Sequence, residues 1–331
     1  MPPVRPPLHR TATPLALVAI AAALVAGCGG DDESTVEDPS QSASEASSFP
    51  PAEGSLEDLI AESQSGDEIV VSAAGQVFVE GRNRFGFGVF SVDGEQITDA
   101  NVAVYAAHGA TGKTEGPFPA AVEDLETEPA FTAATTANDP DAAQAVYVTN
   151  LELDRPGEWR LVALVEQDGG FAAVRFPSIV AQTPASDKVP APGEEAPVIH
   201  TPTTDEVGDV SQIDTRIPPS SMHDVDFADV VGDQPVVLLF ATPALCVSRV
   251  CGPVVDVAEQ VKRDRPDDAA YIHMEIWNQN DPNKGARSQV LDYNLRTEPW
   301  LFVINSDGTV SSRIEGAFSI DELNQALDEA S

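Results

Sequence analysis

Apolar and polar residues alternate along the chain between about residue 67 and residue 182, the pattern expected of half-buried β-strands. Turn-forming stretches such as Asp154-Arg155-Pro156-Gly157 separate the alternating runs. About seven short strands in roughly 115 residues predict an antiparallel, all-β sandwich over residues 67–182. Six of the expected strands are residues 76–79, 85–90, 101–105, 145–148, 159–165 and 170–176.

The pattern changes in the last third of the chain, where buried strands and helical periods alternate. Val236–Phe240 is a continuous apolar run, as in a strand that is buried on both faces. Ser319, with Glu322 three residues later, predicts the start of a final helix with a capping box. The expected order is β-α-β-α-β-β-α, with strands at 236–240, 271–277, 300–304 and 309–314 and helices at 253–263, 284–293 and from 319 onward.

Residues 183–206 are rich in Pro, Glu and Thr, which predicts a linker between the two patterns. Once the first 66 residues are set aside, roughly 270 residues remain, a length that favours two domains over one. The predicted domains are therefore residues 67–182 and residues 207–331.

The first 27 residues have the composition of a secretory leader. Arg5, His9 and Arg10 precede an apolar stretch, residues 14–27, that is shorter than the roughly 20 residues of a membrane-spanning helix. Leu24-Val25-Ala26-Gly27-Cys28 resembles the bacterial lipobox. This resemblance implies that Cys28 carries the lipid (palmitate among its chains) and becomes the N-terminus of a protein anchored on the outer face of the cell membrane.

Residues 28–66 begin with a Gly-, Asp- and Glu-rich stretch and are predicted to be a disordered acidic tether. The whole sequence has 54 Asp and Glu residues against 18 Lys and Arg residues. A negative charge of that size repels phosphate backbones, so nucleic acid is excluded as a partner. The sequence has no phosphate loop, zinc-protease helix or calcium loop, so no cofactor and no metal is expected from motifs.

Cys246 and Cys251 are the two cysteines left once Cys28 is lipidated. Outside the cytoplasm such a pair is a disulfide, a redox pair or a metal site. In a helix, residues five apart are separated by about 7.5 Å along the axis, more than the roughly 6.8 Å that a disulfide allows between Cα atoms. A bridge therefore requires residues 247–250 to be non-helical, and Pro253 predicts that a helix begins near it.

A cysteine at a helix N-terminus has a lowered pKa because the helix dipole and free N–H groups stabilise the thiolate. We therefore expect Cys251 to be the nucleophile, with Arg249 as an additional positive charge, and Cys246 to be the resolving cysteine.

The chain from about Val207 to Ala330 resembles the thioredoxin superfamily. The matching features are Phe240-Ala241 at a strand end, Cys251-Gly252-Pro253, and Pro299 where the family has a cis-proline. The resemblance implies a thioredoxin-like α/β fold in which Cys246, Cys251 and Pro299 form the site. Val254 occupies the position of the family's second cysteine, so the motif is C-x4-C instead of C-x2-C. In the first domain, the turn that leads to Trp159 resembles bacterial immunoglobulin-like modules.

Three functions remain open from the sequence. The first is a thiol–disulfide oxidoreductase acting on exported proteins and contributing to cell redox homeostasis. The second is a non-catalytic binding or structural lipoprotein in which Cys246 and Cys251 form a structural disulfide; Val254 favours this function. The third is a copper-handling protein, in which His273 or His223 joins the two thiolates.

Overall fold

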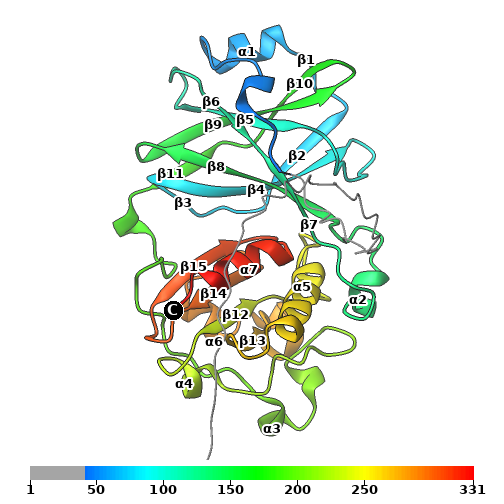
Figure 1. Cartoon of the computed structure of the whole chain (residues 1–331), viewed down its shortest axis with the longest axis vertical. Coiled ribbons are helices and arrows are strands. Elements are labelled where there is room, and N and C mark those ends of the chain that lie inside the picture. The colour runs from blue at the N-terminus through cyan, green and yellow to red at the C-terminus, as the bar shows by residue number, and fades with distance from the viewer. Residues whose placement is uncertain (1–41) are drawn as a thin grey trace, which may run out of the picture. The chain divides into compact units, whose positions relative to one another are not determined.

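The structure of the protein is a computed structural model, and it describes residues 42–331 (Figure 1). The first half of this part is built mainly of strands, with the short helix α2 in the loop between β7 and β8. The elements are α1 (Leu56–Glu62), β1 (Gln64–Ser65), β2 (Ile69–Ala73), β3 (Phe78–Val79), β4 (Gly81–Ser91), β5 (Val102–His108), β6 (Glu115–Pro119), β7 (Ala121–Asp124), α2 (Ala134–Ala137), β8 (Ala145–Leu153), β9 (Gly157–Gln167), β10 (Gly170–Arg175) and β11 (Ile179–Gln182).

These strands form two sheets that share one apolar core. One sheet has the order β2-β4-β8-β7, and the other has the order β1-β10-β9-β11-β3, with β5 paired to β9 and β6 to β5. Most pairs are antiparallel, but β1–β10 and β3–β11 are parallel. Phe87 of the first sheet and Trp159 of the second are both fully buried in this core. The immunoglobulin-like resemblance and the domain boundaries stay predictions.

The predicted disordered tether is wrong for its last part. Residues 46–48 form a 3₁₀ helix and α1 follows, with Ser55 as its N-cap. Phe49, Leu56 and Leu59 are buried against Tyr105 and the neighbouring apolar side chains of β5 and β9. These apolar residues give the segment a surface to bury, which its acidic beginning lacks. Cys28 and the leader lie outside the residues that the structure describes.

The second half contains the predicted alternation of strands and helices. Its elements are α3 (Thr204–Val207), α4 (Phe227–Val230), β12 (Val236–Phe240), α5 (Cys251–Asp264), β13 (Ala270–Met274), α6 (Ser288–Asp292), β14 (Trp300–Ile304), β15 (Val310–Glu315) and α7 (Ile320–Asp328). The sheet has the order β13-β12-β14-β15, in which β12 is parallel to β13 and antiparallel to β14, and β14 is antiparallel to β15. This order and these directions are those of a thioredoxin-like sheet.

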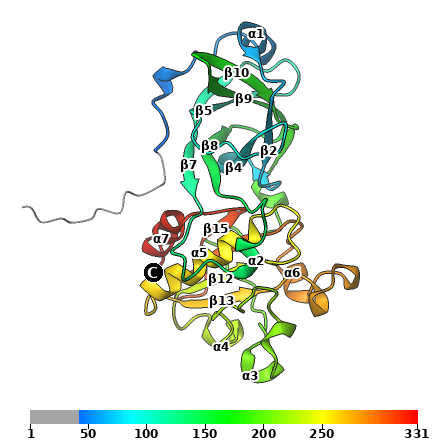
Figure 2. The same cartoon turned by 90° about the vertical axis from the view of Figure 1, so that its right-hand side faces the viewer.

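Both faces of this sheet are covered, as the apolar run in β12 predicts. Val237 and Leu239 face the core under α5 and α7, whereas Leu238 and Phe240 belong to the core on the opposite face. Figure 2 shows α5 and α7 on one side of β12 and β13 and α4 on the other. The predicted linker, residues 183–206, contributes to the second core, because Val189 and Ile199 are buried there.

Contacts between the two halves are specific and partly buried. Arg84 of β4 donates from Nε and Nη2 to the two carboxylate oxygens of Glu322 at 2.6 and 2.7 Å. Ser319 caps α7 as predicted, since its hydroxyl accepts from the Glu322 N–H. The expected capping box is incomplete because the Glu322 carboxylate is engaged by Arg84 instead. Residues 42–331 belong to one compact unit, and within them no helix is long and apolar enough to cross a membrane.

Candidate active site

The two cysteines flank the connection between β12 and α5. Residues 241–250 form turns and irregular backbone, and Arg249 has a positive φ of 63°. Residues 247–250 are therefore non-helical, as a close approach of the two cysteines requires. The helix α5 begins at Cys251, two residues before Pro253, so Cys251 occupies the predicted place at a helix N-terminus.

Cys246 is partly exposed, and hydrogen-bond donors surround its sulfur. The Ser248 hydroxyl lies 3.2 Å from Cys246 Sγ. The thiol of Cys251 and the backbone N–H groups of Val250 and Cys251 also donate to it. These donors lower the pKa of Cys246 to about 6, the hydrogen bond from Cys251 having the largest effect, although partial burial opposes them. Cys246 is thus the thiol that ionises near neutral pH.

Cys251 has the opposite environment. Its side chain is 0% exposed and packs with apolar residues between α5 and the sheet. Burial raises the pKa of the Cys251 thiol, and its hydrogen bond to the Cys246 sulfur and the charge on that sulfur raise it further. The expectation that Cys251 is the nucleophile is wrong. The helix N-terminus does stabilise a thiolate, but its N–H groups point at Cys246 rather than at the cysteine that begins the helix.

Contrary to the expectation from the sequence, Arg249 does not direct its positive charge at the thiols. Its guanidinium pairs with Asp139 and also lies 3.1 Å from Asp141, both in the loop between α2 and β8. Its carbonyl accepts from Ala143 N at 3.1 Å. Arg249 therefore ties the cysteine loop to the neighbouring loop of the strand-rich half.

Glu298, which precedes Pro299, is close enough to the thiols to interact with both electrostatically. The Glu298–Pro299 peptide bond is cis, as the sequence predicts. Burial and the negative charge of Cys246 raise the pKa of the Glu298 carboxyl, and the charge of Glu298 in turn raises the pKa of Cys251. Glu298 is not among the site residues predicted from the sequence, although its position directly before the cis-proline is the signal that marks it.

A loop of the strand-rich half covers the start of α5. The backbone N–H of Ala133 donates to the Asp256 carboxylate at 3.1 Å. Arg216 Nε donates to the same carboxylate at 2.9 Å, and both charged side chains are buried. At Gly252, an added Cβ would lie 2.8 Å from the Thr136 Oγ1 atom. The segment around α2 is therefore packed directly against the residue that follows Cys251.

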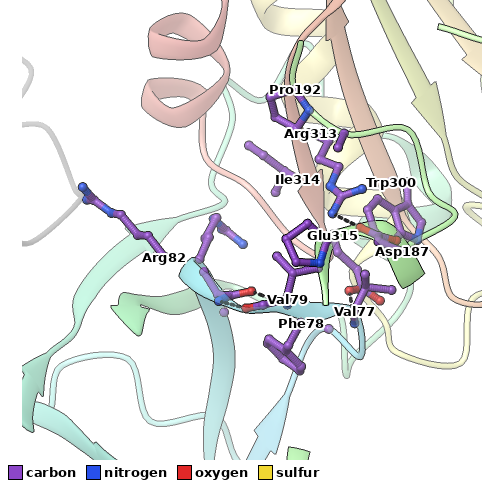
Figure 3. A pocket seen from close by; sticks show the side chains of 16 residues that line it. Val77, Phe78, Val79, Arg82, Asp187, Pro192, Trp300, Arg313, Ile314 and Glu315 are labelled. Carbon is purple, nitrogen blue, oxygen red and sulfur yellow. Dashed lines mark hydrogen bonds and ion pairs between the residues drawn. The ribbon is translucent and has the colours of Figure 1, made fainter. Parts of the chain in front are cut away.

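Two cavities are found in the part of the chain that the structure describes, and one of them reaches the start of α5. One, of about 740 Å³, is formed mainly by the segment between β7 and β8, and Pro253 lines it two residues from Cys251. The other, of about 270 Å³, is shown in Figure 3 and lies between β3, β4 and β15. In it, Arg313 pairs with Asp187 at 2.5 Å, while Glu315 accepts from the Val77 N–H. Neither of these two cavities is lined by Cys246 or Cys251.

The two histidines considered for copper do not lie with the thiols. Across residues 42–331, the one group of three potential ligands that could hold a metal ion is Asp214, His223 and His273. Both histidines are buried in that group, and His273 bonds through Nε2 to the Ala241 carbonyl. In the structure, Cys246 and Cys251 therefore lack the nearby histidine that a Cys–Cys–His copper site needs.

No protein-family model matches the sequence, and no curated protein sequence matches it. Among solved structures, a similar one is a thioredoxin-family thiol:disulfide interchange protein from Chlorobium tepidum TLS, which is 18% identical. That match has a TM-score of 0.28 and covers 44% of this chain and 99% of the other. The second half is thioredoxin-like in the order and directions of its strands β12 to β15.

Proposed function

We propose that the protein is a thiol–disulfide oxidoreductase that acts on exported proteins. The observation that carries the proposal is the difference between the two thiols. Cys246 is accessible and has a pKa of about 6, whereas the buried Cys251 hydrogen-bonds to it and stays protonated. An accessible thiolate next to a protected second thiol is the arrangement that disulfide exchange needs.

The reaction has two exchange steps. In the first, the Cys246 thiolate attacks one sulfur of a substrate disulfide; a Cys246–substrate bond forms, and the other substrate sulfur leaves as a thiolate. In the second, Cys251 loses its proton and attacks Cys246 Sγ, which releases the second substrate sulfur as a thiolate. The substrate gains two electrons and the cysteine pair becomes a disulfide. The same steps in reverse oxidise a substrate dithiol.

The proposal places this chemistry outside the cytoplasm, with Cys28 as the lipidated anchor in the cell membrane. The support is the lipobox-like sequence and the leader before it. In cells, Cys28→Ala is expected to move the protein from the membrane fraction to the soluble fraction. Ser34→Ala, a substitution beyond the lipobox, is the control that leaves the fractionation unchanged.

The deciding measurement is the reduction potential of the Cys246–Cys251 pair. The purified full-length chain is equilibrated in glutathione buffers, and its thiols are counted by differential alkylation and mass spectrometry. A potential between about −120 and −270 mV is that of a working oxidoreductase. A Cys251→Ser variant then retains mixed disulfides on Cys246, whereas Cys246→Ser retains none.

One observation favours a second function, a binding or structural protein with a permanent bridge. Cys251 is fully buried, and the segment around α2 packs on the neighbouring Gly252. In that case the disulfide stays closed below about −300 mV, as structural disulfides do. The same titration therefore separates the two functions.

A further inference from the structure

Asp214, His223 and His273 meet inside the thioredoxin-like half, although they come from three separate segments. Asp214 follows the 3₁₀ helix Val210–Gln212, His223 lies in the loop before α4, and His273 is the fourth residue of β13. His223 Nε2 lies 3.0 Å and His273 Nδ1 lies 3.5 Å from Asp214 Oδ2. None of the three side chains is more than 1% exposed.

The surrounding groups fix which atoms face the centre of this cluster. Arg216 N donates to Asp214 Oδ1 at 2.7 Å and Ser220 N donates to Oδ2 at 2.6 Å, so Oδ2 keeps one lone pair for the two imidazoles. His273 Nε2 lies 3.1 Å from the Ala241 carbonyl, which can only accept, so the hydrogen of a neutral His273 is on Nε2. The lone pair of His273 is then on Nδ1, facing the carboxylate.

His273 Nδ1 and Asp214 Oδ2 are two electron-rich atoms that face each other in a buried site, and a cation between them would attract both, whereas the Ser220 hydroxyl, 3.2 Å from Nδ1, can donate to only one of them. A hydrogen bond from an imidazolium to a carboxylate is about 2.7–2.9 Å long, well below the 3.5 Å between His273 Nδ1 and Asp214 Oδ2. Two ligands of one tetrahedral zinc ion, each bound at about 2.0–2.1 Å, lie roughly 3.3 Å apart. The observed distances from Asp214 Oδ2, 3.0 Å to His223 Nε2 and 3.5 Å to His273 Nδ1, lie on either side of that value.

We propose that Asp214 Oδ2, His223 Nε2 and His273 Nδ1 bind a divalent transition-metal ion of the zinc class. Two imidazole nitrogens and one carboxylate oxygen suit such an ion, whereas calcium and magnesium prefer oxygen ligands alone and Cu(I) prefers thiolates. The bond from His273 Nε2 to a backbone carbonyl is the contact that orients metal-bound histidines. Ser220 Oγ, 3.2 Å from His273 Nδ1, is placed to be a fourth ligand or to hold a water that is.

The site is connected to the cysteine loop on two sides. Thr215, next to Asp214, accepts from Ala244 N at 3.1 Å through its hydroxyl and donates that hydroxyl hydrogen to Glu275. The Ala241 carbonyl that holds His273 begins the loop that ends at Cys251. A bound ion therefore stabilises the backbone that positions both thiols, without touching either sulfur.

The test is metal binding by the purified full-length chain after removal of metal with a chelator. We expect about one Zn²⁺ per chain by native mass spectrometry and calorimetry, and Co²⁺ spectra with tetrahedral ligand-field bands but no thiolate charge-transfer band. The wild-type spectrum identifies the ligand type without any substitution. A thiolate band, or no stoichiometric binding at all, overturns the proposal. In the absence of binding, Asp214, His223 and His273 form a hydrogen-bonded network without a metal ion.

Substitutions then assign the ligands. His223→Gln and His273→Gln are expected to weaken Zn²⁺ binding by about tenfold or more, while the Cys246→Ser/Cys251→Ser double variant binds as wild type does. His200→Gln is the matched control, because His200 also contacts a carboxylate, Asp226, but is 85% exposed. Circular dichroism checks that each variant is folded. Unchanged binding in both folded histidine variants, or loss of binding in the double cysteine variant, contradicts the site.

Discussion

Cys246 accepts a hydrogen bond from the thiol of Cys251, and this bond lowers the pKa of Cys246 while it raises that of Cys251. The N–H groups at the start of α5 point at the same sulfur. The charge of the reduced pair is therefore concentrated on Cys246, the thiol that is partly exposed to solvent.

The reactivity of Cys246 is expected to depend on pH with a midpoint near its pKa of about 6. The thiolate is the reactive form, so the rate of alkylation by iodoacetamide rises as pH increases through that value and levels off above about pH 7. Cys251→Ala removes the donor and shifts the midpoint upward, while Cys251→Ser keeps a hydroxyl donor and shifts it less. Faster labelling of Cys251 than of Cys246 would contradict this.

Glu298→Gln is expected to lower the pKa of Cys251, because the Glu298 charge raises it. In the proposed reaction, the second exchange step then becomes faster at neutral pH, since more of Cys251 is ionised. Stopped-flow measurement of the decay of a Cys246 mixed disulfide reports this rate. Glu329→Gln, at the exposed end of α7, is the control and leaves the rate unchanged. An unchanged rate in Glu298→Gln means that its charge does not act on Cys251.

Gly252 and Thr136 are expected to be energetically coupled. Alanine is favoured over glycine in a helix by about 1 kcal/mol, but a Cβ at residue 252 meets the Thr136 hydroxyl oxygen at 2.8 Å. Gly252→Ala alone therefore raises the free energy of unfolding only slightly. The same change in a Thr136→Ala background is expected to raise it by about 1 kcal/mol. Urea unfolding of the four proteins of this double-mutant cycle measures the coupling. Additive effects would show that the two residues are not in contact.

Asp256 and Arg216 form a buried ion pair that also holds Ala133. Asp256→Leu alone leaves the Arg216 charge buried without its partner and is expected to cost about 3–5 kcal/mol of unfolding free energy. The double variant Asp256→Leu/Arg216→Met is expected to recover most of that loss, since no buried charge remains. Chemical denaturation tests both. A double variant that is less stable than Asp256→Leu alone would show that the unpaired Arg216 charge is not the cause of the loss.

Several parts of the fold could be predicted from local sequence. The apolar run of β12 predicts a strand buried on both faces, and Ser319 predicts the start of α7, because each signal depends on neighbouring residues only. The non-helical loop between the cysteines and the start of α5 near Pro253 follow in the same way.

The partners of charged and polar groups were decided by the tertiary structure. Glu322 reads as half of a capping box, but Arg84, 238 residues away, binds its carboxylate. Residues 46–62 were predicted to be part of the tether because the sequence does not show the partners of their few apolar side chains, which lie in β5 and β9. The alternating pattern of strands in residues 67–182 was visible in the sequence, but not the loop of that region that packs on α5.

The sequence by itself determined which residues the proposed reaction would use: two thiols, near a proline before a strand. The tertiary structure decided which thiol ionises, since burial and donor direction depend on side chains brought together from several segments. It also decided that His223 and His273 meet Asp214 rather than the cysteines. A pKa and a ligand set depend on distances in space, and spacing along the chain does not contain them.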